Sequence, residues 1–291
     1  MKKFLLAVFA IAGIAISAMA QDEPKEKLNV LIDYFDRPSS VPFKYAETAR
    51  NSVMEALHQS NRINLIDVDT QAILKIEEDR RMEGVSAGGD MERLALMEQQ
   101  GANLLIQGVV NDIAISENVL TDSKGQKTYT YDATFLITLK VVNPKDGKII
   151  ETATIKAPGG LFDLQGFTVV AHTPDEAVAG YSKLIPGKMK KFIAAAFPII
   201  GNVLEVSDAK NDDVKTFYVD LGDANGAKKG QKYEIRELRT IGSKTSRKTI
   251  GEAEVQDVEG DDISLFKVKK GGKELGAALK GGSKVIVTSK E

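Results

Sequence analysis

One segment of this sequence matches a known pattern for a nucleophilic serine. Gly84-Val85-Ser86-Ala87-Gly88 fits G-x-S-x-G, in which a strand must precede the serine, a helix must follow it, and a histidine must act as base. The charged end of an expected helix, residues 77–81, precedes it instead. The only histidines are His58, within an expected helix, and His172, just before another. The pattern favours a flexible Ser/Gly loop, with a serine hydrolase using Ser86 as an unsupported alternative.

A cluster of acidic residues surrounds Gly260. It consists of Asp257, Glu259, Asp261 and Asp262. Carboxylates can hold calcium, but this cluster lacks the order of ligands found in an EF-hand loop. The spacing is more typical of a solvated turn between strands, and a weak surface calcium site remains the alternative. We therefore expect no metal centre.

Glycines at 222, 226 and 230 could suggest a loop that holds phosphate. Such loops follow a strand and open a helix, so that backbone N–H groups point at the anion. These three glycines lie between expected strands. We therefore expect no nucleotide or other cofactor, and no enzymatic activity.

The amino terminus has the order of a secretory signal. Met1-Lys2-Lys3 is followed by an uncharged apolar run, residues 4–19, and by the small residues Ala18 and Ala20 that suit cleavage. The run falls short of the ~20 residues that a membrane-spanning helix needs. We predict a signal peptide over 1–20 and a spacer over 21–27, with an uncleaved anchor as the alternative. No cysteine is present for a lipid anchor or a disulfide.

Charge is balanced along the chain. The formal net charge is −2, and it becomes about −4 if Lys2 and Lys3 leave with the signal. Such a balance does not attract nucleic acid or an acidic membrane surface.

The first part of the chain alternates strand-like and helix-like patterns. Apolar residues recur at helical spacing over 44–59, and Thr173-Pro174-Asp175-Glu176 is a capping box that opens a helix. We expect this helix to run to Ala196 with a kink at Pro186. The other predicted elements are strands at 28–36, 63–68, 103–110, 128–142 and 148–156 and helices within 69–81 and 90–101. This order predicts an α/β domain over 28–200, a mixed sheet with flanking helices.

Short strands without helical periodicity follow Pro198. They are expected at 203–206, 216–221, 232–239, 252–258, 262–268 and 283–288. Several short strands at this spacing predict a small all-β barrel or sandwich over 201–291.

Three stretches in the first domain resemble the CsgG-like family. They are Val30–Phe35, then Arg62–Val68 with Ile73-Leu74 behind it, and the Gly-Ala-x-x-x-Ile-x-Gly strand at 101–108. That family includes the curli-production assembly and transport channel, and it is related in fold to envelope lipoproteins that activate penicillin-binding proteins. The resemblance implies a mixed sheet with helices against it and ring-like oligomers.

The second domain resembles the carboxy-terminal domain of flagellar assembly protein T. Tyr218–Gly222, Gly226 and Lys229–Ile235 carry the similarity. Asn225-Gly226 and Lys229-Gly230 indicate turns in which glycine takes a positive φ or lets two backbones approach closely.

Channel members of the CsgG-like family cross the outer membrane with two long hairpins, whose places here are 113–131 and 157–172. The first has Asp122, Ser123, Lys124 and Lys127 at its centre. The second is a Gly- and Phe-containing loop. A spanning strand needs ~9–11 residues with an apolar face, so we expect neither segment to form a pore.

Two apolar segments are candidate contact surfaces. Residues 192–200 form the most apolar stretch after the signal and favour packing of a helix end. The other segment carries Leu161, Phe162, Leu164 and Phe167. These four side chains either enter the core or form an exposed patch, and in the second case they are the predicted partner contact.

These features together predict an exported periplasmic protein that acts through protein contacts in envelope assembly, secretion or maintenance. The expected partners are envelope proteins and copies of the chain itself, with at most peripheral contact to the outer membrane. An outer-membrane secretion channel is the alternative from another class.

Overall fold

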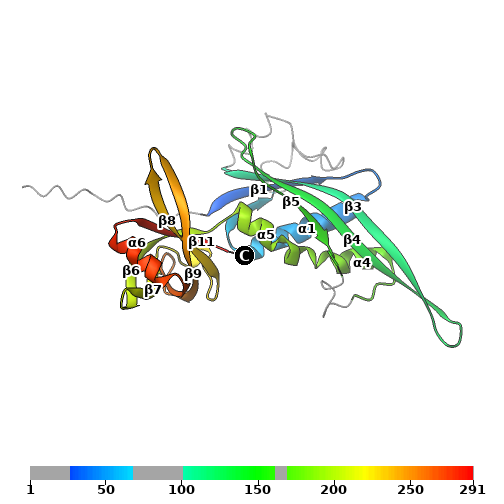
Figure 1. Ribbon diagram of the computed structural model, residues 1–291. Helices are drawn as coiled ribbons and strands as arrows, with labels where there is room; N and C mark the ends of the chain where they lie inside the picture. The colour runs from blue at the N-terminus through cyan, green and yellow to red at the C-terminus, as the bar shows by residue number, and fades with distance from the viewer. Residues whose placement is uncertain (1–26, 68–100, 161–168, 291) are drawn as a thin grey trace, which may run out of the picture.

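The computed structural model describes residues 27–67, 101–160 and 169–290 (Figure 1). Several predictions fall outside these ranges. They are the signal peptide 1–20, nearly all of the 21–27 spacer, the helices expected within 69–101, Ser86, and the four apolar residues Leu161, Phe162, Leu164 and Phe167.

A mixed five-stranded sheet forms the first domain. Its strands are β1 (Leu28–Asp36), β2 (Ile63–Asp67), β3 (Leu104–Thr121), β4 (Lys127–Val142) and β5 (Ile149–Ala157). They lie in the order β2-β1-β3-β4-β5, with β1 parallel to β2 and β3 and the remaining pairs antiparallel. The predicted mixed sheet is confirmed, and β3 runs eleven residues beyond the predicted end at Val110.

Three helices cover one face of this sheet. They are α1 (Phe43–Ser60), α4 (Pro174–Ser182) and α5 (Ile185–Ala196). In α1 the apolar residues at helical spacing, among them Val53 and Leu57, are fully buried. They join sheet residues such as Ile106 and Leu139 in one core. The packing of the 192–200 stretch is also confirmed, because Phe192, Ile193 and Phe197 are buried in the core of the first domain and Ile199 in that of the barrel.

The prediction of one kinked helix over 173–196 was wrong. The helix stops at Ser182, and a second one starts at Ile185. Pro186 lies in the first turn of α5, where its missing N–H leaves no hydrogen bond unmade. The proline therefore starts a helix instead of bending one. The predicted cap is present, since the Thr173 side chain accepts a hydrogen bond from the Glu176 N–H at 3.2 Å.

A closed six-stranded barrel forms the second domain. Its strands are β6 (Ile200–Lys210), β7 (Asp213–Val219), β8 (Lys232–Ile241), β9 (Lys244–Val258), β10 (Ser264–Lys270) and β11 (Lys284–Ser289), in the order β10-β7-β6-β11-β8-β9. At its centre, Phe266 stacks on Phe217 with ring centroids 5.7 Å apart and meets Tyr233 edge to face with centroids 5.0 Å apart. The glycines of the two predicted turns, Gly226 and Gly230, have φ values of 80° and 82°, which confirms their conformation.

The barrel contains a helix that the sequence did not indicate. This helix, α6 (Gly272–Lys280), buries Leu275 and Ala278 in the barrel core. Gly276 packs on the Asp212 carbonyl, so closely that a Cβ would collide with it. Glycine is a poor helix former. Because this segment contains two glycines, helix propensity alone did not predict it.

Arg62 joins the two domains. Its guanidinium donates hydrogen bonds to the Phe197 carbonyl at 3.2 Å, the Ser289 hydroxyl at 3.0 Å and the Lys290 carbonyl at 3.0 Å. Burial lowers the pKa of this guanidinium. Nearby, Lys228 donates to the Gln59 carbonyl at the end of α1 at 3.2 Å. The end of α1 is thus fixed to the carboxy-terminal strand of the barrel.

No helix of the described residues is long and apolar enough to span a membrane.

Candidate interaction surfaces

The two histidines considered as catalytic bases lie at different ends of α1. His58 lies exposed in the last turn of α1. His172 lies exposed just before α4, whose Asp175 pairs with Lys44 at the opposite end of α1 at 2.7 Å. The fourteen residues of helix between Lys44 and His58 separate the two ends by ~21 Å. One serine could therefore not use both histidines, and Ser86 itself is outside the described residues.

The acidic turn around Gly260 has a structural role in its backbone. The Gly260 carbonyl accepts the Asp223 N–H at 3.1 Å, and the Asp261 carbonyl accepts the Ala224 N–H at 3.0 Å. Asp257 pairs with Lys229 at 3.6 Å. Within 27–67, 101–160 and 169–290, no group of three or more histidines or carboxylates is placed to hold a metal.

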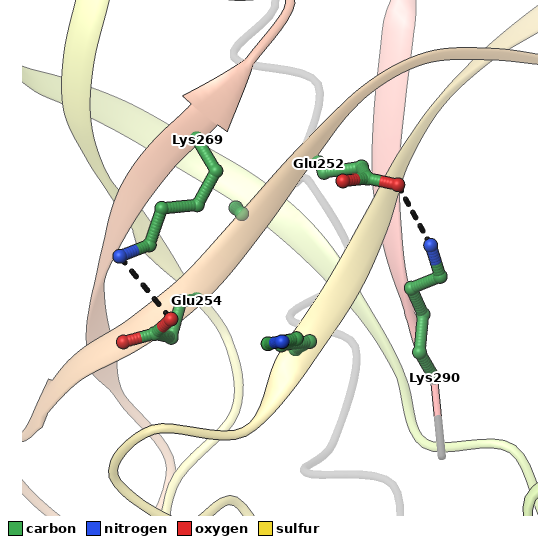
Figure 2. Close-up of a pocket in the computed structure, with 6 residues that line it drawn as sticks. Glu252, Glu254, Lys269 and Lys290 are labelled. Atoms are coloured by element: carbon green, nitrogen blue, oxygen red, sulfur yellow. Dashed lines mark hydrogen bonds and ion pairs between the residues drawn. The ribbon is translucent and has the colours of Figure 1, made fainter.

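A groove of about 620 Å³ crosses the outer wall of the barrel. It is lined by Lys232, Glu252, Ala253, Glu254, Lys269 and Lys290. Figure 2 shows two ion pairs in it, Glu252 with Lys290 at 2.7 Å and Glu254 with Lys269 at 3.2 Å. The pair with Lys290, helped by Lys270, lowers the pKa of the Glu252 carboxyl, and Glu252 raises the pKa of Lys290. A charged ligand could bind here only by displacing these pairs.

This groove was not predicted, although the sequence contains a signal for it. Glu252 and Glu254 alternate along β9 and face Lys270 and Lys267 on the neighbouring β10. Opposite charges across a strand pair at alternate positions indicate a ladder of surface ion pairs. Such ladders stabilise modestly and supply no nucleophile or base.

A long hairpin projects from the first domain. Beyond Val109, β3 leaves β1, and β4 pairs with β5 only from Phe135 onward. Residues 112–132, the β3–β4 arm, therefore extend away from the sheet as two strands (Figure 1). Asp122, Ser123 and Lys124 lie in the turn between the strands. These polar residues were the reason for expecting no pore from 113–131, and because they lie in the turn they do not interrupt the strands.

The two faces of the β3–β4 arm differ in polarity. Directly opposed pairs on one face are Ile113–Phe135, Ile115–Ala133, Glu117–Tyr131 and Val119–Tyr129. Near the tip of this face, Val119 is 47% and Tyr129 46% exposed. The other face is mainly Ser, Thr, Asn and Asp, with Leu120 as its exposed apolar residue. An apolar stripe therefore continues from the domain core to the tip of the arm.

The root of the arm is held by a partly buried contact. Tyr181 of α4 donates to the Asp132 carboxylate at 2.6 Å, and Asn118 donates to the other oxygen of this carboxylate at 2.8 Å. Burial and the hydrogen bond to Asp132 raise the pKa of Tyr181 to about 12. The arm is thus a rigid extension of the domain at its base.

Both outer edges of the arm are open over most of their length. The Tyr131 N–H reaches the Ala171 carbonyl at 2.9 Å, but no described strand pairs with β3 beyond Val109 on its outer side or with β4 before Phe135. Open edges present unpaired N–H and C=O groups that can bind a further strand. The arm therefore combines an apolar stripe with two backbone edges.

Comparison with known proteins gives distant structural similarity. No protein-family model and no curated protein matches the chain. The PelC dodecamer from Paraburkholderia phytofirmans is 12% identical, with 56% of this chain and 88% of that chain covered and a TM-score of 0.31. A lipoprotein from Neisseria meningitidis is 13% identical, with 45% and 81% covered and a TM-score of 0.31. The C-terminal domain of LpoB from Escherichia coli is 11% identical, with 47% of this chain and 87% of that chain covered and a TM-score of 0.29.

Proposed function

We propose that this chain is an exported, non-enzymatic protein of the CsgG-like type, which acts through protein contacts in envelope assembly, secretion or maintenance. The observation that carries the proposal is the β3–β4 arm. Its partners are other envelope proteins and further copies of the chain.

The geometry of the arm supports a protein partner. Val119 and Tyr129 face each other across the strands and leave a paired apolar surface close to the tip. Aromatic side chains with exposed apolar neighbours are typical anchors of protein interfaces. The open edges next to this surface can add main-chain hydrogen bonds to the partner.

The experiment is chemical crosslinking in cells that produce the chain, with the products identified by mass spectrometry. The double variant V119S/Y129S should lose the crosslinks of the arm, because it removes the apolar pair and leaves the root intact. L120S is the matched control, since Leu120 is 63% exposed but lies on the polar face. An unchanged set of crosslinks in the double variant would overturn the proposal.

One observation favours a second candidate, an outer-membrane channel subunit. The β3–β4 arm has strands of sufficient length, and the side chains alternate between an apolar and a polar face, as membrane-spanning strands require. Half of the companion segment 157–172, residues 161–168, lies outside the described residues. A purified chain that needs detergent to stay in solution would support the channel, and one that is monodisperse without detergent would exclude it.

A serine hydrolase remains a separate class. A fluorophosphonate probe labels an activated serine covalently. Labelling that is lost in S86A would contradict the non-enzymatic proposal.

A further inference from the structure

A second hairpin projects from the barrel. β8 leaves β11 after Leu238, and β10 reaches β9 only from Glu252 onward. Residues 239–249 are called the basic arm: 239–246 pair only with each other, and 247–249 pair with residues 236–238 of β8. The ribbon shows the arm extending from the barrel wall (Figure 1). Two residues, Gly242-Ser243, form the turn.

The basic arm concentrates positive charge. It contains Arg239, Lys244, Arg247 and Lys248 and no acidic residue, which gives it a formal charge of +4 in a chain whose net charge is −2. Arg239 pairs with Glu237 at 2.6 Å. Lys248 lies directly opposite Glu237 and helps to lower the pKa of its carboxyl. Within the part of the chain that the structure describes, no ion pair involves Lys244 or Arg247.

An apolar residue occupies the apex of this arm. Ile241 is 66% exposed and directly faces Lys244 across the turn. By the alternation of strands, Arg239 and Lys248 lie on the same face as Ile241, with Glu237 on that face at the root, and Arg247 lies on the other face. A partner that carries only charge would bury no apolar surface of the isoleucine. A bilayer surface offers anionic headgroups for the cations and hydrocarbon directly beneath them for the isoleucine.

We infer that the basic arm binds the surface of a membrane that contains anionic phospholipid, with Ile241 entering the interfacial layer and the cations contacting headgroups. The net charge of the whole chain indicated no attraction to an acidic membrane surface, because it averages this arm with acidic regions elsewhere. The inference does not depend on the protein contacts proposed for the β3–β4 arm.

The test is co-sedimentation with vesicles. The chain from Gln21 onward is used, because the apolar leader expected over 1–20 would itself enter lipid. It should bind vesicles that mix phosphatidylglycerol with phosphatidylcholine and should not bind pure phosphatidylcholine. Each basic residue near an anionic surface contributes about fivefold in partition, so K244Q/R247Q/K248Q should bind on the order of 100-fold more weakly.

Two further variants separate the components. I241S should weaken binding to the mixed vesicles by about fivefold to tenfold through loss of apolar burial. K124Q/K127Q, which removes two exposed lysines from the other arm, should change nothing.

Two results would overturn the inference. One is vesicle binding that the triple variant retains. The other is binding that I241S leaves intact while a DNA duplex or dextran sulfate binds as tightly as the vesicles, because the partner would then be a soluble polyanion.

Discussion

Two hairpins of the same architecture leave the two domains of this protein, and they differ in charge. The β3–β4 arm has four carboxylates and two lysines, a formal charge of −2, whereas the basic arm has four cations and no carboxylate. The β3–β4 arm also carries a long apolar stripe, while the basic arm exposes one isoleucine at its apex. A projecting hairpin is therefore only a shape, and the side chains on it decide which kind of surface it can bind.

The two arms share a way of being fixed to their domains. At the root of the β3–β4 arm, Asp132 accepts a hydrogen bond from Tyr181 at 2.6 Å. At the root of the basic arm, Glu237 accepts one from Ser283 at 2.8 Å and pairs with Arg239, and these contacts lower the pKa of the Glu237 carboxyl. In the first case the carboxylate belongs to the arm, and in the second it lies in β8 two residues before the arm, and in both it is bound by a side chain of the domain.

The largest effect is expected at the joint that sets the two arms relative to each other. R62A removes three hydrogen bonds between the domains and leaves their acceptors without this donor, so the free energy of unfolding should fall by about 2–3 kcal/mol. Because the chain has no cysteine, S123C and S243C place one spin label on each turn. The distance distribution between the labels should broaden in R62A.

K228A is the matched control for this experiment. Lys228 also bridges the domains, but its single hydrogen bond to the Gln59 carbonyl is exposed. We expect K228A to change the free energy of unfolding by less than about 0.5 kcal/mol and to leave the distance distribution between the two spin labels unchanged. A narrow distribution in R62A would mean that other contacts alone hold the arms in place.

The root of the β3–β4 arm should give the next largest effect. Y181F removes the donor to Asp132 and should reduce the free energy of unfolding by about 1 kcal/mol at neutral pH. Because the folded-state pKa of Tyr181 is raised to about 12, its contribution is complete below the ordinary tyrosine pKa of about 10 and is lost as pH rises from there toward 12. Unfolding in urea at several pH values measures both effects, and Y181F should lose less stability than the unaltered chain over this alkaline range.

Y45F provides the comparison for Tyr181. Tyr45 makes an equally short hydrogen bond to Asp175, at 2.6 Å, but this pair is exposed. We expect Y45F to lower the free energy of unfolding by less than about 0.5 kcal/mol, because water replaces the lost hydrogen bond. Equal losses in Y45F and Y181F would show that burial at the root of the arm has no special role.

The elements that the sequence predicted are those in which one face is buried. Residues 28–36 and 128–142 alternate or are continuously apolar because they lie against the core, and α1 shows helical spacing for the same reason. The predictions failed where burial does not dictate the pattern. In α6, close backbone packing requires glycines at 272 and 276, and glycine lowers helix propensity.

Both arms were only partly predictable, since each is exposed on both faces over much of its length. The outer half of β3 carries Ser116, Glu117 and Asn118 and shows its strand character only through its pairing with β4. In the basic arm, Gly242-Ser243 between two β-prone runs was an available signal for a two-residue turn. The local charge was also available, but a count over the whole chain concealed it.

Arg50 shows a further limit of sequence analysis. It is 1% exposed, donates to the Asp33 carbonyl at 2.9 Å and to Asp67 at 2.5 Å, and lies over the Tyr34 ring at 5.1 Å. A single arginine on a helix gives no indication that it will be buried beneath the ends of two strands. Only the three-dimensional arrangement of β1, β2 and α1 supplies its partners.

The smallest effect is expected at the two turns, and it sharpens the comparison between the arms. Gly125 and Gly242 have φ values of 80° and 63°, and a Cβ at either position would meet nothing within 4 Å. G125A and G242A therefore add only backbone strain, about 1 kcal/mol each. Since an exposed hairpin can open without unfolding its domain, hydrogen exchange should accelerate near each tip while the global urea midpoint stays unchanged.

The turns should differ in how they absorb this strain. In the β3–β4 arm, the Asp122 carboxylate accepts the Lys124 and Gln126 N–H groups, both at 2.8 Å, and supports a longer loop. The two-residue turn of the basic arm has no such support, so exchange should accelerate more in G242A than in G125A. G187A is the control, because this helical glycine also has open space but no positive φ, and alanine there should stabilise α5 by up to ~1 kcal/mol. Equal acceleration in the two arms would indicate that turn length does not control the order of either tip.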